Sequence, residues 1–141
     1  LYNSLKNTEG VTVSLGTIIV PEEYRNGLDI NFDNFKTASN GGTNGAKNLC
    51  VDIRQTKWQD ETNGIYTAAL INLKKANYTK QFSARGYMKV TYADSSVEYF
   101  YSDFDKDANA RSISQVATEA IKDSDSYTSE QLAILKVFAG Q

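Results

Sequence analysis

Three aspartates stand at alternate positions in the stretch SDFDKDANA, just before a segment with helical spacing. They are Asp103, Asp105 and Asp107. Carboxylate oxygens at alternate positions are the ligands that begin a calcium-binding loop. No other part of the chain comes closer to a reactive or metal-binding pattern. Two interpretations compete: a calcium site, or a solvated connection between a strand and a helix.

The later positions of this stretch do not continue the calcium pattern. Counted from Asp103, an EF-hand loop requires glycine at position 6, an oxygen ligand at position 9 and glutamate at position 12. The sequence places Ala108, Arg111 and Ser114 there. Acidic residues before a helix are also favoured by the partial positive charge of its N-terminus. The sequence therefore favours the connecting segment and predicts no metal site.

The composition restricts the remaining chemistry. The 141 residues include no histidine and one cysteine, Cys50, so a Ser-His-Asp triad, a histidine-ligated zinc and an intrachain disulfide are excluded. Cys50 lies in NLCVDI, whose alternation predicts a strand, and we expect a small buried side chain rather than a reactive thiol. Fifteen basic and seventeen acidic residues are scattered, which argues against nucleic-acid binding. No apolar run is long enough to span a membrane.

Most of the chain shows the alternation of polar and apolar residues that is typical of β-strands. We expect strands at 11–20, 28–32, 49–58, 65–73, 82–92 and 97–101. The turn Ala93-Asp94-Ser95-Ser96 joins the last two as a hairpin. A lone sheet of such strands would leave one apolar face in water, so the sequence predicts a β-sandwich.

Two helices are predicted near the C-terminal end. Apolar residues at 113–121 follow the helical period, and a second apolar stripe covers 132–139. Thr128 and Gln131 form a capping-box pattern before the second helix, and Gly140 is placed to end it. Each stripe must be buried on another surface, and the sheet is the nearest one.

We expect these parts to form a single domain, mainly β, with a sandwich over 1–104 and the two C-terminal α-helices over 105–141 packed on it. The stretch LINLKKANYTKQFSA at 70–84 resembles the corner between two strands of immunoglobulin-like and fibronectin type III-like sandwiches. In those folds a tyrosine hydroxyl bonds back to the backbone across the corner. Tyr78 matches that tyrosine, so the resemblance implies a structural role for it.

A longer resemblance spans most of the chain. It looks like a module of large secreted or surface-attached proteins of Gram-positive anaerobic bacteria, in the segments GTIIVP (16–21), FSARGYMKVTY (82–92), YSD (101–103), NARSI (109–113) and SEQ (129–131). Such modules accompany repeats, glycan-active domains or anchoring domains. The resemblance implies an extracellular, non-catalytic module without a cofactor, whose partners are neighbouring modules of a longer chain.

Two functions fit this interpretation. One is adhesion, presentation or spacing on a bacterial surface, with a surface protein or polysaccharide as partner. The other is carbohydrate binding that targets an appended enzyme to a polysaccharide. Aromatic rings stack on sugars, and the residues that we rank highest for such stacking are Trp58, Tyr66, Tyr24 and Tyr87. Aromatic residues are also common in strands and cores, so each has a structural alternative.

An enzymatic role is not expected. A glycoside hydrolase needs two carboxylates across a cleft, and the sequence is rich in carboxylates. They are grouped, however, in turn-like segments near strand ends, where charged residues serve as solvated caps.

Overall fold

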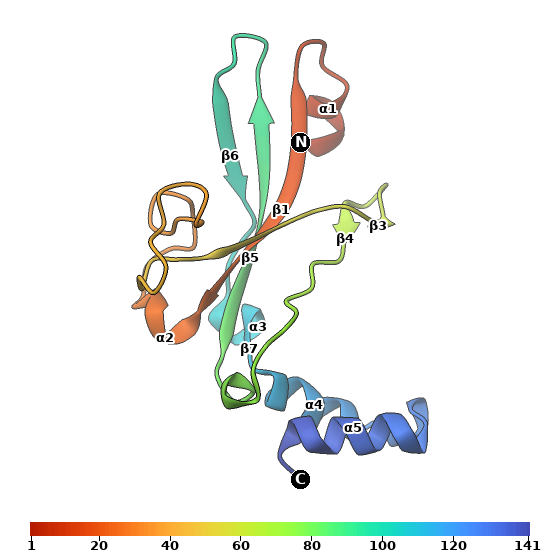
Figure 1. The fold of residues 1–141 in the computed structure, drawn as a ribbon. Helices are drawn as coiled ribbons and strands as arrows, with labels where there is room; N and C mark the ends of the chain where they lie inside the picture. The colour runs from red at the N-terminus through yellow and green to blue at the C-terminus, as the bar shows by residue number, and fades with distance from the viewer.

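The computed structural model describes residues 1–141 and shows antiparallel sheets together with short helices. The main sheet has the strand order β2-β1-β5-β6, and β7 lies beside the beginning of β5 (Figure 1). β1 and β5 pair along their whole length in antiparallel register. The strands are β1 (Thr12–Pro21), β2 (Val51–Arg54), β5 (Phe82–Thr91), β6 (Val97–Tyr101) and β7 (Ala110–Arg111).

A second sheet is present only as a two-stranded ribbon, in which β3 (Trp58–Asp60) pairs with β4 (Ile65–Tyr66). The strand predicted at 28–32 is wrong, because this segment turns. The side chain of Asn31 accepts hydrogen bonds from the backbone amides of Asp33 and Asn34, and such a bond pattern competes with an extended strand. The strand predicted at 65–73 ends at Tyr66.

The core lies on one face of the main sheet. Strand residues on that face pack against side chains from the irregular segment between α2 (Glu22–Arg25) and β2, and the buried cluster comprises Ile18, Val20, Tyr87, Ile30, Phe35 and Cys50. Cys50 is buried, as expected from the sequence, and burial raises the pKa of its thiol to about 11, with the Asp52 charge adding to the effect. The segment at 28–50 therefore covers this face without forming strands.

Two helices, α4 (Ile113–Ile121) and α5 (Ser129–Ala139), lie at the end of the sheet where β5 begins (Figure 1). Each begins with a complete capping box, and Gly140 ends α5 in the left-handed conformation at φ 79°. Most contacts of the pair are between the two helices themselves. The Ser114 hydroxyl donates a hydrogen bond of 2.8 Å to the Phe138 carbonyl, which joins α4 to the end of α5.

The remaining helical segments are short. α1 (Tyr2–Lys6) precedes the sheet, α3 (Lys106–Asn109) lies between β6 and β7, and two 3-10 turns are η1 (Lys75–Asn77) and η2 (Ser124–Ser126). None of the helices has the length and hydrophobicity that crossing a bilayer requires.

Candidate functional site

An aromatic cluster lies where α1 and the β3–β4 ribbon approach the main sheet. The Trp58 ring centre lies 5.5 Å from that of Tyr2 and 6.2 Å from that of Tyr66. The Tyr66 hydroxyl donates a 2.5 Å hydrogen bond to the Gly16 carbonyl and lies 3.2 Å from the Thr17 hydroxyl. The structure thus brings two of the predicted stacking residues together. The hydrogen bond to Gly16 holds the Tyr66 side chain against β1, and Trp58 lies half-buried beside it.

A cavity of about 300 Å³ opens beside this cluster, and its lining includes Tyr2, Tyr66 and Phe100. Lys6, on the same helix as Tyr2, lies 5.4 Å from the Tyr2 ring centre and forms an ion pair with Glu61. Aromatic rings with charged groups nearby suit a sugar ring, which needs both stacking and orientation.

Sequence reasoning did not rank Tyr2 or Phe100 for this cluster. The hairpin register could have indicated Phe100: it lies opposite Met88, so the two side chains project from the same face of the sheet. Tyr2 belongs to a short helix at the start of the chain, and nothing in its sequence context pointed to Trp58.

Of the other two predicted stacking residues, Tyr24 lies elsewhere, whereas Tyr87 is among the residues around the same cavity but belongs to the core. Tyr24 is on α2, is 40% exposed and lines a different cavity from that beside Tyr66. Tyr87 is 6% exposed, its ring packs edge-on against Phe32, and its hydroxyl donates a 2.7 Å hydrogen bond to Asp52. Burial and the Asp52 carboxylate raise the pKa of Tyr87. Tyr87 therefore has no free ring face for a sugar, because it fills the core opposite Gly16.

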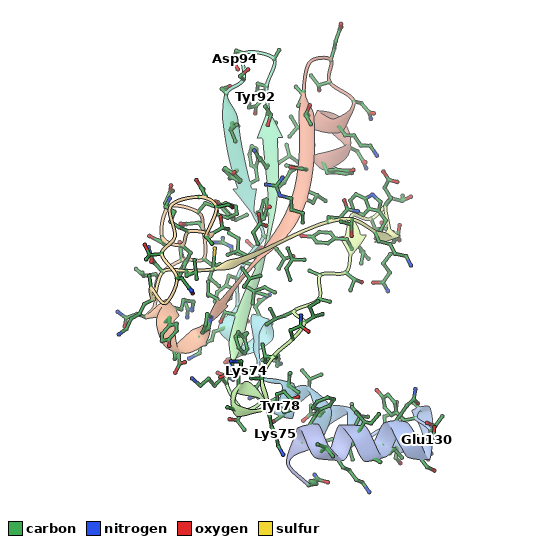
Figure 2. All side chains as sticks on the ribbon, viewed as in Figure 1. Lys74, Lys75, Tyr78, Tyr92, Asp94 and Glu130 are labelled. Atoms are coloured by element: carbon green, nitrogen blue, oxygen red, sulfur yellow. The ribbon has the colours of Figure 1, made fainter.

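Tyr78 does not form the predicted tyrosine corner. Its ring packs edge-on against Phe138 at 5.1 Å between centres, and no hydrogen bond from its hydroxyl to the backbone is present. Its carbonyl accepts a 2.9 Å hydrogen bond from the Ser114 amide, and Figure 2 shows Tyr78 between the end of the sheet and the helices. A corner needs a strand on both sides, and the residues before η1 are not a strand. Tyr78 instead attaches the helical pair.

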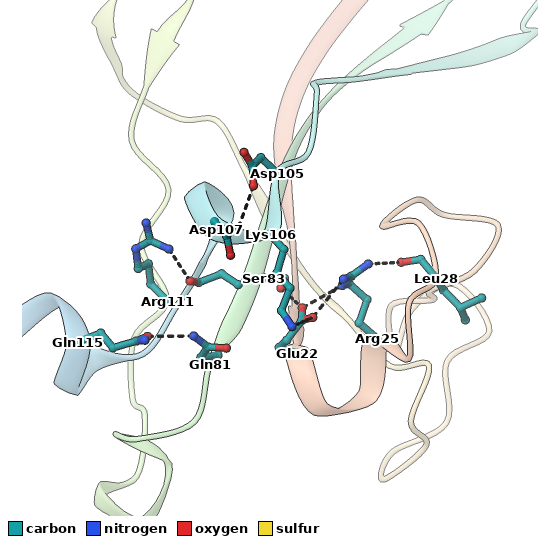
Figure 3. Close-up of polar contacts among 11 residues, drawn as sticks. Glu22, Arg25, Leu28, Gln81, Ser83, Asp105, Lys106, Asp107, Arg111 and Gln115 are labelled. Carbon is teal, nitrogen blue, oxygen red and sulfur yellow. Dashed lines mark hydrogen bonds and ion pairs between the residues drawn. The ribbon is translucent and has the colours of Figure 1, made fainter.

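The acidic stretch at 103–107 forms a joint between β6 and β7. The Asp105 carboxylate caps α3 by accepting a 2.8 Å hydrogen bond from the Asp107 amide (Figure 3). The Asp105 amide donates to the Asn109 side chain. The structure holds no group of three acidic or cysteine side chains placed to bind a metal ion. The capping contact gives Asp105 the connecting role that the sequence favours.

A largely buried ion pair lies at a junction between α2, β5 and α3 (Figure 3). Glu22 accepts hydrogen bonds of 2.9 and 3.1 Å from Arg25 and another from Ser83, and Lys106 lies 3.7 Å away. The side chains of Glu22 and Arg25 are 14% and 13% exposed. Burial alone would raise the pKa of Glu22, but the hydrogen bonds from Arg25 and Ser83 lower it overall. The Glu22 carboxylate thus connects α2, β5 and α3 through its contacts with Arg25, Ser83 and Lys106.

We expect Glu22→Gln to lower the free energy of unfolding by about 1–3 kcal/mol, because it leaves the Arg25 guanidinium half-buried without its carboxylate. The folded-state pKa of Glu22 is depressed, so its stabilisation is complete above the unfolded value near 4.5 and is lost as the pH falls through the lower folded value. Urea denaturation from pH 7 to pH 3 should show the free energies of unfolding of the unsubstituted chain and of Glu22→Gln converging at low pH. Glu23→Gln, in an exposed pair with Lys80, should change stability by less than about 1 kcal/mol. A constant difference down to pH 3 would contradict the assignment.

A second surface is a groove on the sheet face opposite the core, next to the helical pair. It is a cavity of about 440 Å³, and 11 of its 13 lining residues are hydrophobic. We call it the apolar groove; its lining includes Ala68, Leu70, Ala84, Val116, Leu135 and Phe138, with Arg111 among its polar members. A smaller cavity of about 340 Å³ adjoins it, and both share Ile19, Leu70, Leu73 and Phe82.

Comparison of the chain with protein-family models, with curated proteins and with solved structures finds no match. Its function must therefore be argued from its own surfaces. The aromatic cluster around Trp58, the apolar groove and the smaller cavity that adjoins the groove combine a cavity with exposed or half-buried apolar side chains.

Proposed function

We propose that the chain is a non-catalytic accessory module of a secreted or surface-attached bacterial protein, and that it works by contact, in adhesion, presentation or spacing. The observation that carries this proposal is the apolar surface left open. Only 14 of 141 residues are buried, while Ile71, Val116, Ile134 and Val137 are 55–71% exposed. Exposed apolar patches mark surfaces that contact another molecule. The extracellular setting is proposed from the resemblance of the sequence to bacterial surface modules.

The working form in this proposal is a β-sandwich of the immunoglobulin-like or fibronectin type III-like kind, with the helical pair packed against it. Two features support it. The main sheet is antiparallel, and residues 67–73 cross the face opposite the core, where a second sheet would lie. The ribbon β3–β4 leads directly into that segment.

A second candidate function is carbohydrate binding at the aromatic cluster. The specific observation in its favour is the cavity lined by Tyr2, Tyr66 and Phe100, beside the half-buried Trp58. Stacking of a sugar ring on one aromatic face is compatible with a shallow cavity of this kind. Tyr24 would belong to a separate contact in this case, because it lines another cavity.

Attachment of coated beads distinguishes the two functions. Beads that carry the chain are passed over surfaces coated with polysaccharides or with extracellular proteins, and the retained fraction is counted. The contact proposal predicts that Val116→Ser with Val137→Ser lowers retention at least fivefold, because these exposed side chains supply apolar contact area. Trp58→Ala with Tyr24→Ala serves as the matched pair and should leave retention unchanged.

The opposite pattern, with retention on polysaccharide that depends on Trp58, would favour carbohydrate binding. Absence of retention on every surface would contradict both functions. Release of reducing ends from a retained polysaccharide would contradict the non-catalytic role.

A further inference from the structure

We propose that the apolar groove receives an extended, acidic strand from a partner protein, and that this strand pairs with residues 67–71 to complete a second sheet. The inference rests on the proposed contact function and names the chemistry of the partner. It follows from three independent features: an unpaired backbone, an alternating side-chain pattern beside a cavity, and cations without carboxylate partners.

The backbone of residues 67–73, which we call the strap, has no hydrogen-bond partner. None of its N–H or C=O groups bonds to the backbone of another residue. Figure 1 shows the strap running from β4 to η1 separately from the strands of the main sheet. Backbone groups beside an apolar surface are normally paired, and an unpaired extended segment accepts a further strand.

From Thr67 to Ile71 the side chains of the strap alternate as those of a strand do, and the alternation ends at Asn72, which is exposed and adopts φ 60°. Ala68 and Leu70 are half-buried and line the apolar groove, whereas Thr67, Ala69 and Ile71 are exposed. A strand paired with the strap would direct every second side chain towards the same face. The cavity of about 440 Å³ on that face is within the range of sites that enclose ligands, so it has room for those side chains.

The basic residues near the apolar groove indicate the charge of the partner strand. Lys74 and Lys75 follow the strap directly, at the η1 end that Figure 2 labels, and Arg111 lines the apolar groove. None of these three cations is in an ion pair; the six pairs in the structure involve other basic residues. Glu119, which lies near Arg111, is paired with Lys122 at 2.7 Å. An acidic strand is therefore complementary to this surface, and a basic one is repelled.

Fluorescence anisotropy with designed peptides tests the proposal. The probe is fluorescein-labelled DVTIEVTVD, which alternates apolar residues and carries acids. Two controls differ in one property each: KVTIKVTVK reverses the charge, and DVPIEPTVD places proline on both edges. We expect the probe to bind the intact chain at least tenfold more tightly than either control. Hydrogen exchange should show free exchange of the strap amides in the chain alone, and at least tenfold slowing with saturating probe.

Two variants link binding to the groove. Ala84→Phe fills the apolar groove and should weaken probe binding at least tenfold, whereas Ala46→Phe, in the adjoining cavity, should leave it unchanged. Val116→Glu, at a position that is 55% exposed, gives a second test if Ala84→Phe does not fold, and it should weaken the acidic probe at least fivefold.

Several results would overturn the proposal. They are equal affinity for the three peptides, strap amides that stay unprotected, protection that depends on formation of a dimer of this chain, and competition by sodium decanoate without any strap protection in the peptide complex. If the probe fails while beads still attach through Val116 and Val137, the strand inference is wrong and the contact function stands.

Discussion

Replacing Phe35 with alanine is expected to lower the free energy of unfolding by about 3–5 kcal/mol, which is the cost of removing a fully buried phenylalanine ring. Phe35 is 1% exposed, and it enters the core from a segment without helices or strands. Because small domains are stable by only about 5–15 kcal/mol, this one change would remove a large part of the total. Urea denaturation followed by circular dichroism measures it.

The control for this prediction is Leu28→Ala in the same segment. Leu28 is 48% exposed, so its truncation should cost less than about 1 kcal/mol. Hydrogen exchange adds a local readout, because the Phe35 amide donates to the Asn31 carbonyl at 3.0 Å and should lose its protection in the Phe35 variant. Equal costs for the two variants would show that the segment at 28–50 does not act as the covering layer of the core.

The sequence predicts the central strands well because their signals are local. The hairpin of β5 and β6 has both a two-residue alternation and its own turn chemistry: the Asp94 carboxylate accepts from the Ser96 amide, and Ser95 adopts φ 67° at the tip that Figure 2 labels near Asp94. The helix ends are equally local, since a capping box and a terminal glycine determine them. Such features need no knowledge of distant contacts.

The segments at 28–32 and 65–73 show where local signals fail. Both have the alternation of a strand, but a strand also needs a partner for its backbone, and pairing depends on distant parts of the chain. At 28–32 the Asn31 side chain accepts hydrogen bonds from the backbone amides of the two residues after this segment, Asp33 and Asn34, and Ile30 is buried in the core. In the strap the alternation is retained from Thr67 to Ile71, but no other segment of the chain pairs with its backbone.

The error over Tyr87 has a different origin. Alternation shows which residues share a face, but not which face is buried, and Tyr87 shares its strand face with Arg85 and Lys89, whose charges suggest a solvated face. In the structure the Arg85 guanidinium lies over the Tyr101 ring, 5.3 Å from its centre, and also donates a hydrogen bond to the Ser102 carbonyl, so an aromatic ring and a backbone oxygen both contact this charge. Basic residues in a strand therefore do not exclude a buried face.

Gly16→Ala is the substitution that tests this buried face directly, and we expect it to lower the free energy of unfolding by about 1–3 kcal/mol. A Cβ atom at Gly16 would lie 2.5 Å from the Tyr87 ring, which is too close for any side chain. The ring cannot withdraw easily, because its hydroxyl is held by Asp52 and the ring packs against Phe32. The substitution must therefore displace a core side chain or separate β1 from β5.

Gly86→Ala is the matched control, because Gly86 is also a strand glycine of the same sheet. Its added Cβ would meet no atom closer than 3.5 Å, so the substitution should be neutral or stabilise by up to about 1 kcal/mol. A double-mutant cycle isolates the clash: in a Tyr87→Leu background the ring is gone, and Gly16→Ala should then cost less than about 1 kcal/mol. If the cost of Gly16→Ala is the same in both backgrounds, the Tyr87 ring does not fill the space at Gly16, and the assignment of the buried face is wrong.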